Sequence, residues 1–235
     1  MKMDLLLEEN DYYEIENASF DKFTIRHPFR MVASGPTSTG KTQFIFKLLQ
    51  QRENIFDPKI EQVIYLYAEW QSCFSDFKKN VTFSTDLKLL NIYPKKSTLI
   101  IIDDLLSKLS GSIELQELFT QRSHHRGISV ILVSQNIFSQ GPIFRTVKLN
   151  ATHYYLTKHN TDLLQLSYFG RQIEPPGHSK RFSEAYYIAT NNREYGGLFI
   201  TLDSKCRDIE KYVMFESEDF TQPTFILAKD LVQNL

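Results

Sequence analysis

This sequence has almost no net charge, few cysteines and no long hydrophobic stretch. Lys and Arg number 27 against 28 Asp and Glu, a formal net charge of -1. No general positive field therefore draws the chain to nucleic acid or membrane, and any such contact must come from local loops. Apolar runs such as Leu99–Ile102 are far shorter than the ~20 residues that cross a bilayer, so we expect a soluble protein with no membrane partner.

Only two cysteines, Cys73 and Cys206, are present, and the chain does not open on a charged segment followed by an apolar one. Both features favour a reducing, intracellular compartment. The 235 residues, 42% of them hydrophobic, are enough to bury the core of one α/β domain, which we expect at residues 23–235. Residues 1–22 are acidic and lack periodicity, so we interpret them as an N-terminal arm that binds a partner.

Segments with the pattern of strands alternate with segments of helical periodicity. The expected strands are Phe29–Ser34, Val63–Tyr67, Thr98–Ile102, Ile128–Val133, His153–Leu156 and Leu198–Leu202. The expected helices are Lys41–Gln51, Ile113–His125, Asp162–Arg171 and Ser183–Ala189. This alternation predicts an α/β fold with a mostly parallel central sheet flanked by helices.

A phosphate-binding loop follows the first of these strands. Its residues are Gly35, Pro36, Thr37, Ser38, Thr39, Gly40, Lys41 and Thr42, which satisfy every fixed position of G-x-x-x-x-G-K-[ST], the Walker A pattern. Glycines let the backbone bend so that its N–H groups and the helix N-terminus face an anion. We therefore expect ATP at this loop, with Lys41 on the β- and γ-phosphates and the Thr42 hydroxyl on Mg²⁺.

Two carboxylates follow the aliphatic strand Leu99–Ile102, which is the form of a Walker B strand. We expect Asp103 to hold Mg²⁺ directly or through water, and Asp104 to orient and deprotonate the attacking water. Asp104 has an alternative interpretation as a helix N-cap.

The next strand, Ile128–Val133, ends in Ser134, Gln135 and Asn136. An amide at this sheet edge can sense the γ-phosphate or position the lytic water, which makes Gln135 a candidate catalytic residue. The alternative is that Gln135 and Asn136 merely form a turn.

Basic side chains precede that strand, in the helix that Gly127 is expected to end. An arginine here could stabilise charge on the γ-phosphoryl group of a neighbouring subunit, and Arg126 is the first candidate. Arg122 and Arg145 are competitors. The alternatives are that the basic residues at the helix end only compensate the helix dipole, or that these arginines form surface ion pairs. His124 and His125 lack the spacing of metal ligands.

These motifs together resemble the HerA/FtsK superfamily, and more closely the viral genome-packaging ATPases of poxviruses, adintoviruses and Polinton-like elements. The resemblance is carried by Pro28–Met31 leading into the phosphate loop, by Ile100–Asp104, and by the block that runs from Ser123 to Phe138. It implies a RecA/FtsK-like motor that assembles into a ring, moves double-stranded DNA into a capsid and uses a trans arginine. Asp104 departs from the commoner Glu of that family, and Gln121-Arg122 stands where related chains often have glycine.

A packaging motor contacts the DNA backbone, not base edges, because it must move along any sequence. The candidate clusters are Lys78-Lys79, Lys95-Lys96, Lys158-His159 and His178–Arg181, each of which has the alternative of a solvated surface. A capsid protein is the other partner that the resemblance implies. Two other functions stay open, a helicase-like or other motor ATPase and a non-catalytic switch ordered by nucleotide.

Overall fold

The structure, a computed structural model, describes residues 12–15, 23–77, 80–137, 141–161, 163–215 and 223–228. The chain divides into two compact units. The first comprises Met1–Phe23, Ser34–Gln51 and His153–Leu235, and the second comprises Thr24–Ala33 and Arg52–Thr152.

The second unit contains five strands in the order β3-β8-β7-β5-β6, of which β6 was not predicted. Their bounds are Arg30–Ser34 (β3), Ile128–Ser134 (β8), Thr98–Asp103 (β7), Gln62–Tyr67 (β5) and Thr82–Ser84 (β6). The pairs β8–β7, β7–β5 and β5–β6 are parallel, and every residue of β7 and β8 is buried. Continuous aliphatic strands of this kind are typical of a sheet covered on both faces.

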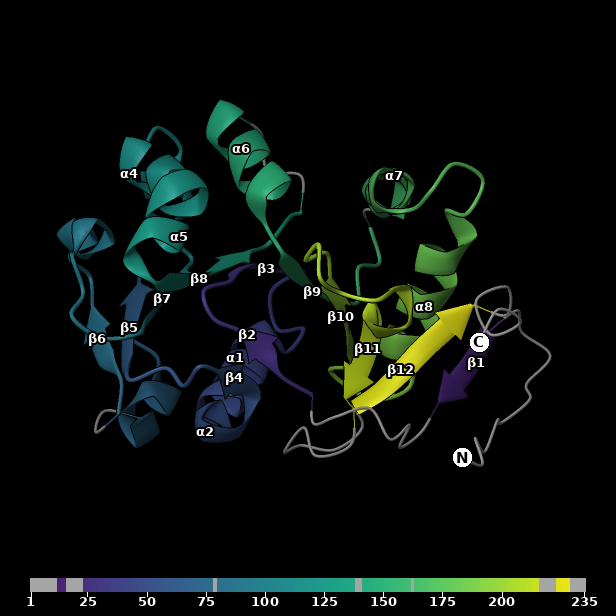
Figure 1. Ribbon diagram of the computed structural model, residues 1–235, viewed down its shortest axis with the longest axis horizontal. Coiled ribbons are helices and arrows are strands. Elements are labelled where there is room, and N and C mark those ends of the chain that lie inside the picture. The colour runs from purple at the N-terminus through teal and green to yellow at the C-terminus, as the bar shows by residue number, and fades with distance from the viewer. Residues whose placement is uncertain are drawn as a thin grey trace. The chain divides into compact units, whose positions relative to one another are not determined.

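One continuous helix in this unit runs through α4 (Ile113–Glu117), the π-helical segment η3 (Leu118–Arg122) and α5 (Ser123–Arg126). It ends at Gly127, which has φ 60° and ψ 49°, as predicted. This helix packs on β8 and on α6 (Pro142–Asn150) (Figure 1). The smaller elements of the unit are α2 (Arg52–Ile55), η1 (Ser72–Phe77), η2 (Leu87–Asn91), α3 (Leu106–Leu109) and the parallel pair β2 (Ile25–Arg26) and β4 (Phe56–Asp57).

The first unit is built on antiparallel strands. Their order is β9 (His153–Thr157), β10 (Gly197–Thr201), β11 (Tyr212–Phe215), β12 (Pro223–Ala228) and β1 (Tyr12–Ile15). The unit also holds α1 (Lys41–Gln50), α7 (Leu163–Ile173), α8 (Lys180–Asn191) and the short η4 (Asp208–Glu210). Phe44 of α1 stacks on Tyr155 of β9 with ring centroids 3.5 Å apart, and α8 packs against β10, β11 and β12.

The α/β fold class is confirmed, and the predicted strands and helices form within a few residues of their expected bounds. One part of the pattern differs, because β10 pairs antiparallel with β9. Two helices, α7 and α8, separate these strands. After α8 the chain re-enters the sheet at the end where β9 left it, so β10 runs antiparallel to β9. A parallel pair would need a crossover connection. Of the predicted acidic arm, only Tyr12–Ile15 lies within the described residues, and it forms β1 beside β12 (Figure 1). Among the described helices, none is both long and apolar enough to cross a membrane.

Candidate nucleotide site

The phosphate loop lies between a strand and a helix, as its motif requires. β3 ends at Ser34 and α1 begins at Lys41, with Gly40 as its N-cap. Three residues have positive φ, namely Gly35 at 157°, Ser38 at 62° and Gly40 at 93°. The backbone therefore curls, and its amide groups precede a ten-residue helix whose N-terminal N–H groups lack partners within the helix.

Residues from distant parts of the first unit crowd both glycines of the loop. A Cβ placed on Gly35 would lie 1.8 Å from Oγ1 of Thr157, at the end of β9. A Cβ placed on Gly40 would lie 2.8 Å from Cβ of Tyr195, in the turn after α8. Atoms cannot approach so closely, so a side chain at either position would force the loop or these neighbours to move.

Threonine hydroxyls tie the loop to β9. Thr39 Oγ1 donates to the carbonyl of Pro36 at 2.7 Å and lies 2.5 Å from Thr157 Oγ1, with which it shares a hydrogen bond. Thr157 Oγ1 also lies 3.4 Å from the carbonyl of Ser34. The curl of the loop is thus held from inside and from the neighbouring strand.

The ammonium of Lys41 lies within the curl. Its Nζ donates to the carbonyl oxygens of Gly35 and Pro36, each at 2.6 Å, and the residue is only 8% exposed. A buried ammonium needs such acceptors, because burial of a charge without partners is costly. The residues fit a bound polyphosphate: a curl without Cβ atoms at Gly35 and Gly40, a helix N-terminus, and a cation that can exchange carbonyl partners for phosphate oxygens.

Asp103 ends β7 in the second unit and is buried, at 3% exposed. Its Oδ2 accepts a hydrogen bond of 2.6 Å from the hydroxyl of Tyr65 on β5. Burial and the charge of Asp103 raise the pKa of Tyr65, so the phenol stays protonated and acts as a donor. A carboxylate oriented in this way suits a cation such as Mg²⁺, which prefers oxygen ligands.

Asp104, the next residue, is exposed and has φ 53°, in the left-handed region. Asp tolerates this conformation better than most residues. The left-handed backbone ends the strand, and the carboxylate of Asp103 is buried whereas that of Asp104 is exposed. The alternative interpretation of Asp104 as a helix N-cap is wrong, because α3 has its N-cap at Leu105.

Gln135 lies at the end of β8, next to β7 in the parallel sheet. The adjoining turn is closed by Ser134, whose Oγ donates to the carbonyl of Asn136 at 2.5 Å and accepts from its N–H at 3.1 Å. The Gln135 side chain is exposed and makes no hydrogen bond within the described residues. Ser134 therefore makes the turn, and Gln135, like Asp103 and Asp104, stands at the carboxyl edge of the parallel strands.

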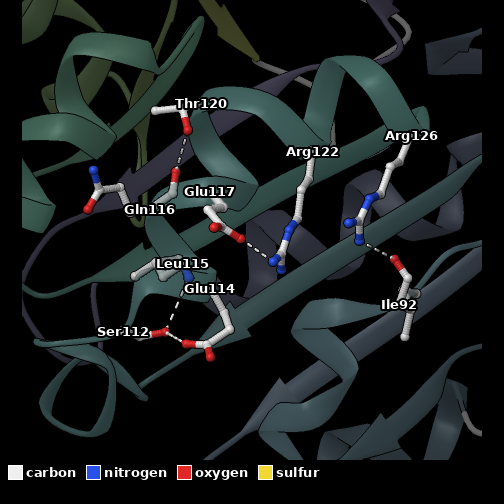
Figure 2. Close-up of polar contacts among 9 residues, drawn as sticks. All are labelled: Ile92, Ser112, Glu114, Leu115, Gln116, Glu117, Thr120, Arg122 and Arg126. Atoms are coloured by element: carbon white, nitrogen blue, oxygen red, sulfur yellow. Dashed lines mark hydrogen bonds and ion pairs between the residues drawn. The ribbon is translucent and has the colours of Figure 1, made fainter.

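The candidate arginines have different surroundings, and Figure 2 shows those of Arg122 and Arg126. Arg122 pairs with Glu117, its side chain is 13% exposed, and its Nη1 is buried with no hydrogen-bond partner in the described chain. Arg126, one turn later, donates to the carbonyl of Ile92 at 3.0 Å and lies over the ring of Tyr93 at 3.5 Å. Arg145 of α6 is exposed.

Arg126 and Gln135 lie beyond opposite ends of β8. The strand has seven residues, Ile128–Ser134, which at ~3.3 Å per residue separate its ends by about 20 Å. No arginine side chain spans that length, so Arg126 cannot reach the carboxyl edge of its own parallel strands.

The side chains of the proposed DNA-contacting clusters also differ in their exposure and in their partners. Lys96 lies 3.9 Å from Glu61, Lys158 donates to Asn191 at 2.6 Å, and His159 is buried. His178 and Lys180 are both exposed. His178 lies in a turn in which its N–H donates to the carbonyl of Pro175 at 3.0 Å, and Lys180 is the first residue of α8. Lys78-Lys79 lies outside the described residues.

The site residues thus fall into two groups, each in one unit. The phosphate loop, Gly35 to Thr42, belongs to the first unit, and Asp103, Asp104, Arg126 and Gln135 belong to the second. Sequence reasoning missed the supporting residues Tyr65, Thr157 and Tyr195, because none belongs to a motif and each lies far along the chain from the residue that it touches.

Comparisons with known proteins agree with this architecture. The B204 DNA-packaging ATPase from Sulfolobus Turreted Icosahedral Virus is similar at TM-score 0.54 and 18% identity, over 77% of this chain and 96% of that chain. The genome packaging NTPase B204 from Sulfolobus turreted icosahedral virus 2, in complex with sulfate, gives TM-score 0.50 and 15% identity, over 77% and 95% of the two chains. No protein-family model and no curated protein matches the sequence. The chain therefore has the fold of viral genome-packaging NTPases, which confirms the resemblance at the level of fold.

Proposed function

We propose that this protein is a magnesium-dependent ATPase that moves double-stranded DNA into a viral or virus-like capsid and hydrolyses ATP to ADP and phosphate. The observation that carries the proposal is the phosphate loop, where Lys41 is buried inside a curl that two glycines permit and two threonines hold. An ordinary turn has no need of a buried ammonium, whereas a polyphosphate site does.

The loop amides and Lys41 would bind the phosphates, and the Thr42 hydroxyl and the Asp103 carboxylate would hold Mg²⁺. The metal ion, when bound, neutralises charge that develops on the β- and γ-oxygens. Tyr65 supports this role of Asp103, because its hydroxyl occupies one carboxylate oxygen and fixes the plane of the group. Thr42 and Asp103 are assigned from their motifs and belong to different units.

Asp104 would orient the attacking water and accept its proton. Its exposure and its left-handed backbone support this role, because strained residues cluster where a side chain must be presented at a fixed point. Gln135 would donate to the γ-phosphate or to the same water, since its amide is exposed at the same edge and the turn is made by Ser134.

The subunits would assemble into a ring, and the position of Arg126 supports this proposal. It lies at the far end of β8 from Gln135, so a guanidinium from this residue would serve the nucleotide of a neighbouring subunit, in trans. Its contacts with the Ile92 carbonyl and the Tyr93 ring preorganise the side chain, and Tyr93 is 77% exposed. Arg145 is the alternative finger, and the ion pair with Glu117 makes Arg122, whose side chain is 13% exposed, the weakest candidate.

Contacts with DNA would come from exposed basic side chains around the start of α8, among them His178 and Lys180, and they would meet phosphates only. The fold shared with B204, a DNA-packaging ATPase, supports this choice of polymer and a capsid protein as the second partner.

Translocation is tested by displacement of a labelled triplex-forming strand from one end of a linear duplex. The proposal predicts displacement with ATP and none with a non-hydrolysable analogue or with Lys41→Ala. Hydrolysis without displacement, with the capsid protein also present, would support a nucleotide-dependent switch and contradict the motor.

A further inference from the structure

The turn between α8 and β10 places an exposed aromatic ring against the phosphate loop. Tyr195 lies in this turn with its Cβ 2.8 Å from where a Cβ on Gly40 would stand, and it is 48% exposed. Within the described chain its ring has no aromatic or cationic partner. Gly40 and Tyr195 both belong to the first unit.

Close packing on two sides fixes the position of this turn. A Cβ on Gly196 would lie 2.5 Å from the carbonyl oxygen of Ala189 in α8, and one on Gly197 would lie 2.5 Å from the ring of Tyr155 in β9. The Gly196 N–H donates to the carbonyl of Arg193 at 3.1 Å. Tyr155 in turn stacks on Phe44 of α1, the helix that the loop opens, so the turn and the loop are held by one set of contacts.

The backbone of Tyr195 is strained, with φ 59°. Glycine or asparagine adopts this left-handed conformation at lower cost than tyrosine does. A bulky aromatic residue in such a place indicates that the ring itself has a use, because backbone strain persists mainly where function requires it.

We infer that the Tyr195 ring stacks on the nucleobase of the nucleotide whose phosphates the loop holds. Only a ribose separates the base from the α-phosphate, so the base must rest on residues that border the loop. Tyr195 borders it at Gly40, directly before Lys41, and about half of the residue is exposed. Stacking of a base on an aromatic side chain tolerates different bases, so the ring contributes affinity for nucleotides more than choice among them.

This inference rests on the proposed nucleotide site, and the experiment separates the two. Binding of ATP and of inorganic tripolyphosphate, each with Mg²⁺, is measured by calorimetry for the wild-type protein, Tyr195→Asn and Tyr195→Phe. Asparagine removes the ring and suits the left-handed backbone, whereas phenylalanine keeps both ring and strain. We expect Tyr195→Asn to bind ATP about tenfold more weakly, about 1.4 kcal/mol, and to bind tripolyphosphate like the wild type. Tyr195→Phe should bind both ligands normally.

A second readout uses 1,N6-etheno-ATP, whose base is fluorescent. Its emission should change on binding to the wild type and to Tyr195→Phe, and not on binding to Tyr195→Asn. An unchanged affinity of Tyr195→Asn for ATP, or equal weakening for both ligands, would overturn the stacking role, the second result by showing that Tyr195 only supports the loop. A wild-type protein that binds neither ligand would overturn the nucleotide site itself.

Discussion

The hydroxyl of Tyr65 donates to Oδ2 of Asp103 across two adjacent parallel strands, at 2.6 Å. The register pairs Tyr65 with Ile101, two residues before Asp103, so that both side chains lie on one face of the sheet. Burial raises the pKa of Tyr65 and keeps its proton in place, so the hydrogen bond is always directed to the carboxylate. The hydrogen bond thereby fixes the orientation of the Asp103 carboxylate.

Removal of this hydroxyl should weaken the response to magnesium. In Tyr65→Phe we expect the Mg²⁺ concentration for half-maximal ATPase activity to rise about tenfold, because partners of metal ligands typically contribute ~10–100-fold to affinity. The control is Tyr67→Phe, which makes the same change two residues along β5, where the hydroxyl makes no hydrogen bond within the described residues. Equal magnesium titrations for the two variants would show that Tyr65 does not orient Asp103.

The hydroxyl of Thr157 should be needed to hold the phosphate loop. Thr157→Val keeps the branched shape and removes the hydrogen bond shared with Thr39, so the loop should sample other conformations. A hydrogen bond of this kind is worth about 1 kcal/mol net, so we expect ATP binding about fivefold weaker by calorimetry. Thr157→Ser retains the hydroxyl and should bind like the wild type. Weakening by Thr157→Ser as severe as that by Thr157→Val would assign the effect to packing.

Much of the fold was predictable because its signals are local. A few neighbouring residues are enough to predict the phosphate loop, the aliphatic strand before Asp103 and the C-cap glycine at Gly127. The antiparallel pairing of β9 and β10 depends instead on how two intervening helices return the chain. Likewise Thr157 lies more than a hundred residues from Gly35, and periodicity carries no information about such a contact. The α/β pattern was predicted correctly from the sequence, whereas the residues that support the site could be identified only from the structure.

Asp104 is expected to act in hydrolysis and not in nucleotide binding. Asparagine adopts the left-handed backbone seen at this position, so Asp104→Asn should fold normally and bind ATP like the wild type. General-base catalysis contributes ~10²–10⁴-fold, and we expect a loss of at least about 100-fold in kcat, measured by phosphate release. Retention of most of the activity would identify another group as the base.

Arg126 is expected to act on a neighbouring subunit, which mixing of inactive variants can test. Arg126→Ala and Asp104→Asn should each be inactive alone, since every subunit interface then lacks one group. Mixed rings contain interfaces where Arg126 of one subunit meets Asp104 of the next, and these should recover ATPase activity. The same mixture made with Arg145→Ala in place of Arg126→Ala is the matched comparison. No recovery with Arg126→Ala would contradict its role in trans.

Steady-state ATPase activity with and without linear double-stranded DNA, measured for the wild type and Lys41→Ala, tests whether the protein is a DNA-dependent motor. We expect DNA to raise the wild-type rate and Lys41→Ala to be inactive in both conditions, because this variant lacks the ammonium that contacts the phosphates. A wild-type rate indifferent to DNA in the presence of the capsid protein, or substantial activity in Lys41→Ala, would contradict the proposed motor.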